Sequence, residues 1–183
     1  IRAFEIAEPS VPISVNFPHK YLCDILQAEA ERIKDNRPKD KDIIINIPFR
    51  SSKSLLVTVL FPAWCWAVYP KMRFITASYS ADISIEHATK SRDIINSEWY
   101  QKHWGETFQI KKDQNLKARY ENNYLGSRRA TSVGGSVTGQ GGDIILVDDP
   151  TSPKNAASQI ERENANEWYK STLYSRLNNP AAG

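Results

Sequence analysis

Residues 48–54 (Pro-Phe-Arg-Ser-Ser-Lys-Ser) contain side chains that could bind a nucleotide phosphate, between an apolar run and an apolar helical segment. A phosphate site of this kind uses backbone N–H groups at a helix N-terminus, a lysine for the phosphates and a hydroxyl for Mg²⁺. Lys53 and Ser54 are placed for the last two roles. By itself the motif is a weak signal, because Ser52 stands where the usual phosphate-binding loop has its last glycine.

A second motif, residues 144–150, consists of four apolar residues followed by Asp148, Asp149 and Pro150. At the end of a buried strand the first acid could hold Mg²⁺, and the second could orient or deprotonate an attacking water. The alternative is a strand that simply ends in an Asp-Asp-Pro turn. The two motifs together are more specific than either alone, because they have the order of Walker A and Walker B motifs.

Two further segments suggest contact with a polyanion. Five of the eight glycines lie in residues 132–142, which indicates either a flexible hairpin or a loop whose backbone approaches a ligand or DNA. Residues 111–129 contain six basic and two acidic side chains, whereas the whole chain has a net charge of +3. Such a patch suits nucleic acid or nucleotide phosphate, with a solvated surface ribbon as the alternative.

Composition excludes several classes of protein. The 183 residues suffice for one domain with a core, here assigned as residues 1–183, and ordinary apolar content with low net charge excludes disorder. No run of about 18 apolar residues is present, so no membrane helix is expected. Cys23 and Cys65 are predicted to be buried free thiols of a reducing cytosol. The start at Ile1 and the linker-like residues 180–183 suggest a piece of a longer protein.

The secondary structure that must position the motifs follows from apolar periodicity. Residues 1–18 are expected to be extended, and 117–133 to form one or two weaker strands. Helices are predicted at 21–36, 55–60, 63–68, 80–96 and 158–177, and buried strands at 43–47, 72–77 and 144–147. This alternation predicts an α/β fold with a mainly parallel central sheet, covered by helices on both faces, and a ligand site at the carboxyl ends of its strands.

Taken in order, these residues resemble the N-terminal ATPase domain of the large terminase subunit, the DNA-packaging motor of tailed bacteriophages. The resemblance covers about residues 17–177. It is carried by residues 47–54, 61–64 (Phe-Pro-Ala-Trp), 78–80 (Ser-Tyr-Ser), 133–139, 148–150 and 168–177. It implies a P-loop NTPase with an extra strand between the Walker A and Walker B strands, and ATP and Mg²⁺ as cofactors.

The resemblance also implies roles for individual residues. ATP would be bound by Phe17 at the adenine and by the loop residues Pro48, Phe49, Arg50, Ser51, Ser52, Lys53 and Ser54. Two of these would also be catalytic: Lys53 would contact the β- and γ-phosphates, and Arg50 would contact the γ-phosphate or couple it to loop motion. Ser54 and Asp148 would hold Mg²⁺, and Asp149 would be the general base, one methylene shorter than the glutamate of many relatives. Arg128 and Arg129 are candidates for an arginine that acts on a neighbouring subunit's nucleotide, with DNA or solvent contact as the alternative. For Phe17 the alternative is a core aromatic.

The activity implied is ATP-driven translocation of double-stranded DNA into a prohead in the host cell cytoplasm. The implied partners are a homo-oligomeric ring, the portal protein and the small terminase subunit. Nuclease activity is not expected, because no acidic nuclease cluster follows residue 177. Two alternatives stay open. One is a helicase-like nucleic-acid-dependent ATPase, and the other is a non-hydrolysing DNA-binding or scaffold module with a decayed nucleotide site, which the glycine-free loop favours.

Overall fold

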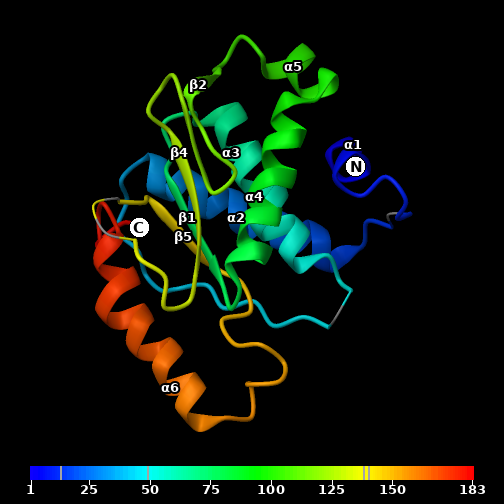
Figure 1. Ribbon diagram of the computed structural model, residues 1–183. Coiled ribbons are helices and arrows are strands. Elements are labelled where there is room, and N and C mark those ends of the chain that lie inside the picture. The colour runs from blue at the N-terminus through cyan, green and yellow to red at the C-terminus, as the bar shows by residue number, and fades with distance from the viewer. Residues whose placement is uncertain (13, 49, 138, 140) are drawn as a thin grey trace.

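The computed structural model describes residues 1–12, 14–48, 50–137, 139 and 141–183. Its centre is a five-stranded sheet in the order β2-β3-β4-β1-β5 (Figure 1). The strands are β1 (Phe74–Ser78), β2 (Ile110–Asn115), β3 (Arg119–Asn122), β4 (Ser127–Ser132) and β5 (Ile144–Val147). β1 is parallel to β4 and β5, whereas β3 is antiparallel to β2 and β4. The α/β class is confirmed, but the sheet is mixed rather than mainly parallel.

The antiparallel part arises from a tight turn that the sequence pattern did not reveal. The Asn122 side-chain oxygen accepts hydrogen bonds from the backbone N–H groups of Tyr124 (2.9 Å) and Gly126 (3.0 Å), which reverses the chain between β3 and β4. A connection this short can join only antiparallel strands. β2 was missed altogether, because five of its six residues are polar (Lys-Lys-Asp-Gln-Asn) and its side chains are half-buried or exposed.

The described part of the chain contains six α-helices. They are α1 (Arg2–Ala7), α2 (Phe17–Lys34), α3 (Phe61–Val68), α4 (Ala81–Asn96), α5 (Glu98–Trp104) and α6 (Gln159–Trp168). A π-helix, η1 (Leu55–Leu60), leads into α3, while η2 (Tyr169–Leu173) and η3 (Tyr174–Arg176) continue α6. The extended conformation expected for residues 1–18 is wrong for residues 2–7 and 17–18, which belong to α1 and to the start of α2. Pro62 does not separate two helices, because it lies in the first turn of α3, where proline's missing N–H is tolerated.

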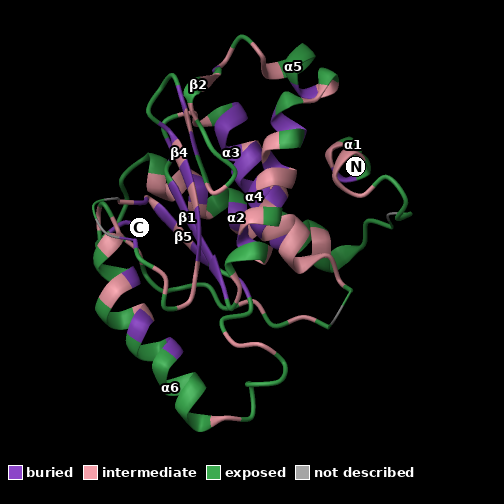
Figure 2. Cartoon of the chain, in the orientation of Figure 1, coloured by how far each residue is buried: buried purple, intermediate pink, exposed green. Residues whose placement is uncertain are grey.

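Hydrophobic residues of the sheet belong to two buried clusters, one on each face. Strand β1 is buried along its whole length and is purple in Figure 2. On one face Phe74 and Leu146 belong to a large core with residues of α2, α3 and α4. On the other face Ile75 and Ala77 pack with Trp168 of α6 and Leu173 of η2. Both expected helical layers are therefore present. None of the helices in the described ranges has the length and apolarity needed to cross a membrane.

The buried strand predicted at residues 43–47 is wrong. The segment has no regular structure, and Ile44 is 82% exposed. Residues 43–46 and the β5 residues line the same cavity of about 590 Å³, so the segment lies near β5, an edge strand, without pairing to it. An apolar run shows that burial would be favourable, but a strand also needs a partner for its backbone. β1 lies between β4 and β5. It pairs with the strand that precedes the acids, but no strand among the described residues precedes the Lys53 loop, so β1 is not an extra strand between two motif-bearing strands.

The cysteines are free, as predicted, although only Cys65 is buried and Cys23 is exposed. Cys23 lies on α2, whose buried residues are Leu22, Leu26 and Ala30. The next residue along a helix is turned by about a quarter circle, so Cys23 lies away from that buried stripe.

Replacing Tyr100 with Phe is expected to change how stability depends on alkaline pH. The buried Tyr100 hydroxyl donates to the Ala63 carbonyl (2.7 Å), and burial raises the pKa of this tyrosine above its ordinary value of 10.0. Losing the bond should cost about 1 kcal/mol at neutral pH. Above pH 10 the unfolded wild-type chain loses this proton and the folded chain keeps it, so wild-type stability falls by about 1.4 kcal/mol per pH unit.

Tyr100→Phe has no phenol to titrate and lacks that loss. The difference in unfolding free energy between this variant and wild type should therefore narrow as the pH rises from neutral to about 11. Urea unfolding over this range measures the effect, with Tyr124→Phe as the control because Tyr124 is exposed. A deficit that stays constant with pH would contradict the buried, neutral phenol.

Candidate functional site

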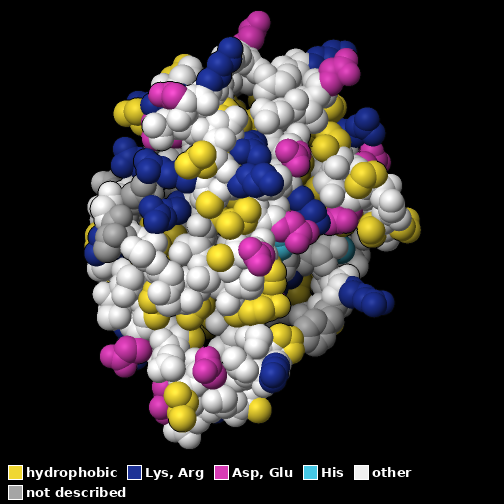
Figure 3. Space-filling view, in the orientation of Figure 1, with side chains coloured by type: hydrophobic (Ala, Val, Ile, Leu, Met, Phe, Trp, Pro, Cys, Tyr) yellow, Lys and Arg dark blue, Asp and Glu magenta, His cyan; other side chains and the backbone are white. Residues whose placement is uncertain are grey.

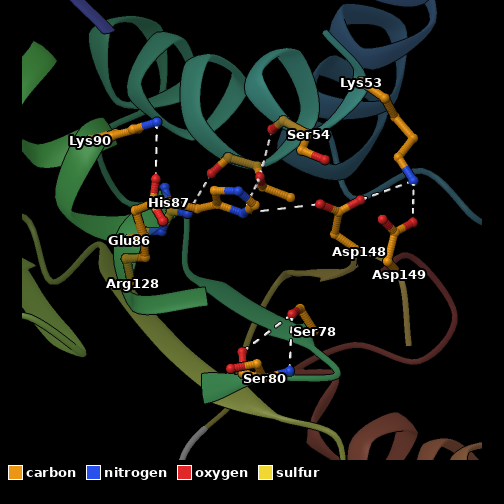
Figure 4. A network of polar contacts seen from close by, with 11 residues as sticks. Lys53, Ser54, Ser78, Ser80, Glu86, His87, Lys90, Arg128, Asp148 and Asp149 are labelled. Carbon is orange, nitrogen blue, oxygen red and sulfur yellow. Dashed lines mark hydrogen bonds and ion pairs between the residues drawn. The ribbon is translucent and has the colours of Figure 1, made fainter. Parts of the chain in front are cut away.

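The structure brings the two sequence motifs together at the end of β5 (Figure 4). Lys53 and Ser54 come directly before η1 in the chain. Asp148 and Asp149 directly follow β5. The Lys53 Nζ atom lies 3.1 Å from Asp148 Oδ1 and 2.6 Å from Asp149 Oδ1. One ammonium group therefore bridges both acids of the second motif.

The two acids differ sharply in exposure. The Asp148 side chain is 8% exposed, whereas that of Asp149 is 58% exposed. Burial lowers the pKa of Lys53, but its hydrogen bonds to Asp149 and Asp148 outweigh burial and raise that pKa above its ordinary value. Lys53 is thus a cation at neutral pH. Asp148 is a carboxylate held inside the protein, and Asp149 is one that solvent water reaches.

The backbone of β1 supports the acids from the neighbouring strand. Asp148 N–H donates to the Ala77 carbonyl (2.8 Å), and Tyr79 N–H donates to the Asp149 carbonyl (3.1 Å). The Ser78 hydroxyl in turn donates to the Ser80 carbonyl (3.2 Å) and accepts from Ser80 N–H (3.3 Å). The Ser-Tyr-Ser segment at the end of β1 therefore positions the loop that carries the acids.

The loop that carries Lys53 borders a cavity of about 570 Å³, lined by residues 45–48, 50–55 and Asp149. Arg50 (φ 61°) and Ser52 (φ 57°) have left-handed backbone conformations, which glycine adopts most easily. The loop thus bends in a glycine-like way at Ser52, where the usual motif has glycine. Phe49 lies outside the described residues.

The donor set fits a magnesium nucleotide. Mg²⁺ prefers oxygen ligands, and in phosphate sites it is held by one or two carboxylates together with phosphate oxygens. The Asp148 carboxylate and the Ser54 hydroxyl match this chemistry, and Lys53 and Arg50 supply positive charge beside the cavity.

Ser52→Gly is expected to stabilise the protein by about 1 kcal/mol, because it removes the strain of a serine at φ 57°. The matched control is Ser51→Gly. Ser51 has no positive φ, so glycine there should instead lower the unfolding free energy by up to about 1 kcal/mol. Urea denaturation of both variants measures the difference. Equal effects of the two substitutions would contradict the left-handed conformation at Ser52.

Of the remaining predicted site residues, the two arginines and Phe17 contact groups other than the acids. The Arg128 side chain is inside the protein, 1% exposed, and it donates to the Thr58 carbonyl, which disfavours contact with a neighbouring subunit. Arg129 is half-buried and donates to the Ser136 carbonyl of the glycine-rich loop (2.9 Å).

Phe17 is 75% exposed and stacks on Tyr21, so it is not a core aromatic. Pro48 and Ser51 line the same cavity as Lys53.

Sequence reasoning missed two residues near the site: His87, which faces Asp148, and Thr58, which contacts His87. His87, from α4, places Nδ1 3.0 Å from the Thr58 hydroxyl and 4.0 Å from Asp148 Oδ2. Thr58, from η1, donates its hydroxyl to the Ser54 carbonyl (2.5 Å). Neither belongs to a recognisable motif. Only the packing of α4 against η1 brings them to the acids.

Comparison of this chain with protein-family models and with curated proteins finds no match in either set.

Proposed function

We propose that this chain binds Mg-ATP and hydrolyses its γ-phosphate, as the ATPase domain of a terminase-like motor that moves double-stranded DNA. The observation that carries the proposal is the Lys53 bridge to Asp148 and Asp149, which lie 95 and 96 positions away in the sequence. A phosphate-binding lysine and two acids of unequal burial are the parts that phosphoryl transfer to water requires.

In the proposed mechanism each residue acts through its position. Lys53 and Arg50 attract the β- and γ-phosphates, and Ser54 and Asp148 supply oxygen ligands for Mg²⁺. The ion, when bound, would neutralise charge that develops on the phosphate oxygens. Asp149 is exposed enough to meet a water molecule, orient it in line with the γ-phosphate and accept its proton.

The DNA part of the proposal is supported by charge on the β2–β3 hairpin. Lys112, Lys117 and Arg119 are exposed, whereas Lys111 is neutralised by its ion pair with Glu121. Figure 3 shows Lys and Arg side chains in the region over β2–β4. Exposed cations bind a phosphate backbone without regard to sequence, which suits a motor that moves any DNA. The ring, the portal protein and the small terminase subunit remain part of this proposal through the sequence resemblance.

Lys53→Ala tests the proposal directly. Mg²⁺-dependent ATP turnover is measured with and without double-stranded DNA, and the expected loss is at least about 10²-fold, because a charge that stabilises the transition state is removed. Lys102→Ala is the matched control, since Lys102 is exposed on α5. Equal turnover of Lys53→Ala and wild type would refute the site. Wild-type nucleotide binding without turnover would favour the non-hydrolysing module instead.

A further inference from the structure

Two arginines stand directly opposite each other in the sheet. Arg119 of β3 is paired with Arg129 of β4 in the antiparallel register. The Ala130 N–H donates to the Ala118 carbonyl (2.8 Å), so the neighbouring pair 118/130 is hydrogen-bonded and the pair 119/129 is of the non-hydrogen-bonded kind. In such pairs the side chains are closest, with Cβ atoms about 4.5–5.5 Å apart on the same face. Two positive side chains therefore begin side by side.

These arginines lie on the face of the sheet that points away from α4. The adjacent pair Tyr120 and Arg128 is buried on the other face, where the Tyr120 hydroxyl donates to the Ala88 carbonyl of α4 (3.1 Å). Successive residues of a strand alternate between faces, which places Arg119 and Arg129 opposite α4. In the described residues, the buried apolar cluster on their face comes from β1, α6, η2 and the glycine-rich loop (Ile75, Ala77, Val137, Trp168, Leu173). It does not extend over β3, so Arg119 is exposed and Arg129 half-buried.

No carboxylate in the described ranges neutralises this pair. Glu121, two residues along β3 on the same face, forms its ion pair with Lys111 instead. The Arg129 Nη2 atom donates to the Ser136 carbonyl (2.9 Å), which holds this guanidinium at the glycine-rich loop. Like charges placed directly opposite each other destabilise a sheet. A feature that opposes stability without local compensation is expected at a functional site.

Unneutralised guanidinium groups of this kind are suited to bind phosphate, because each presents a planar fork of N–H donors that matches two phosphate oxygens. The cavities beside β5 and at the Lys53 loop are lined by neither arginine. A nucleotide is usually held in such a cavity, whereas a DNA backbone can lie on an open surface. Lys117, exposed in the tight turn before Arg119, adds a third cation. The open face thus fits a nucleic acid backbone better than a free nucleotide.

We propose that Arg119 and Arg129 form a clamp on the phosphate backbone of double-stranded DNA, with the Ser136 carbonyl fixing the direction of Arg129. The inference rests on the DNA part of the proposed function and deepens it, because it names residues at which the chain grips the backbone. It also assigns Arg129 to DNA rather than to the nucleotide of a neighbouring subunit.

The experiment measures binding of a short fluorescein-labelled DNA duplex by anisotropy over a range of KCl concentrations. Arg119→Gln, Arg129→Gln and the double variant are compared with wild type. Each lost phosphate contact lowers the slope of log Kd against log [KCl] by about 0.9, so the loss of affinity grows about 8-fold for each tenfold dilution of KCl. The double variant should lose at least this much slope, equally for two unrelated DNA sequences. Arg119→Lys should keep most of the slope, since the charge remains.

Lys102→Gln, exposed on α5, is the matched control for removing one cation. A double variant with the wild-type slope would overturn the clamp, and Mg-ATP turnover by wild type would then still support the proposed ATPase. Loss of DNA-free turnover in Arg129→Gln at an unchanged slope would overturn the clamp in favour of a nucleotide contact. A wild-type chain that binds no DNA would overturn both the clamp and the DNA part of the proposed function.

A second measurement needs no DNA. Arg119→Gln removes the like-charge opposition, so at low salt its unfolding free energy in urea should equal or exceed that of wild type. Any gain should shrink as KCl is raised, because salt screens the repulsion between exposed charges. A variant less stable than wild type at low salt would contradict the unneutralised pair, and with it the proposal.

Discussion

Asp149→Asn should lower the kcat of ATP hydrolysis by about 10²–10⁴-fold, because it removes the general base and leaves the geometry of the loop unchanged. Asn is the appropriate replacement, since Asp149 has φ 45° and asparagine tolerates this left-handed conformation better than alanine does. Lys53 keeps Asp148 as its partner, so no charge is left isolated. ATP turnover under saturating Mg-ATP measures the effect.

Mg-ATP binding should survive in this variant, because the assigned oxygen ligands Ser54 and Asp148 are untouched. Equilibrium binding of a nucleotide analogue therefore serves as the internal check. Asp113→Asn, exposed on β2, is the matched control for removing one carboxylate. Asp149→Glu should keep much of the activity, since it restores the length found in many members of the resembled family. Turnover of Asp149→Asn equal to that of wild type would remove Asp149 from the mechanism.

Trp66→Ala is expected to cost about 3–5 kcal/mol of unfolding free energy, the usual range for a large aromatic in a core. Trp66 is 1% exposed, its ring contacts Phe108 and Tyr120 edge to face, and its Nε1–H donates to the Met72 carbonyl (2.8 Å). The substitution leaves a cavity between α3 and the sheet and an unpaired carbonyl just before β1. Urea denaturation gives the free energy.

Phe17→Ala serves as the comparison for Trp66→Ala, because Phe17 is 75% exposed and its loss should change stability by less than about 0.5 kcal/mol. The same variant probes the predicted adenine contact, which would appear as weaker nucleotide binding without a stability change. A cost below about 1 kcal/mol for Trp66→Ala would contradict its place in the core.

The elements that can be predicted from the sequence are those whose apolar residues recur at the spacing of a helix or a strand. The run 144–147 forms β5, the run 72–77 largely overlaps β1, and 80–96 forms α4, because apolar spacing matches the repeat of each element. The same reasoning fails for residues 43–47, where apolar content is high but no partner strand is paired. It also fails for β2, whose pairing depends on backbone bonds to β3 rather than on apolar side chains.

For the candidate site, the sequence by itself determined the side chains that meet: a lysine and a hydroxyl before one helix, and two acids after one strand. Only the tertiary structure decided that one ammonium bridges both acids, that Asp148 is buried while Asp149 is exposed, and that Arg128 lies inside the protein. It alone placed His87 against Asp148 and Thr58. The physical reason is that a motif is defined by residue types at neighbouring positions in the chain, which the sequence gives directly. Burial, charge pairing and hydrogen-bond direction depend instead on how α4, η1 and the sheet pack together.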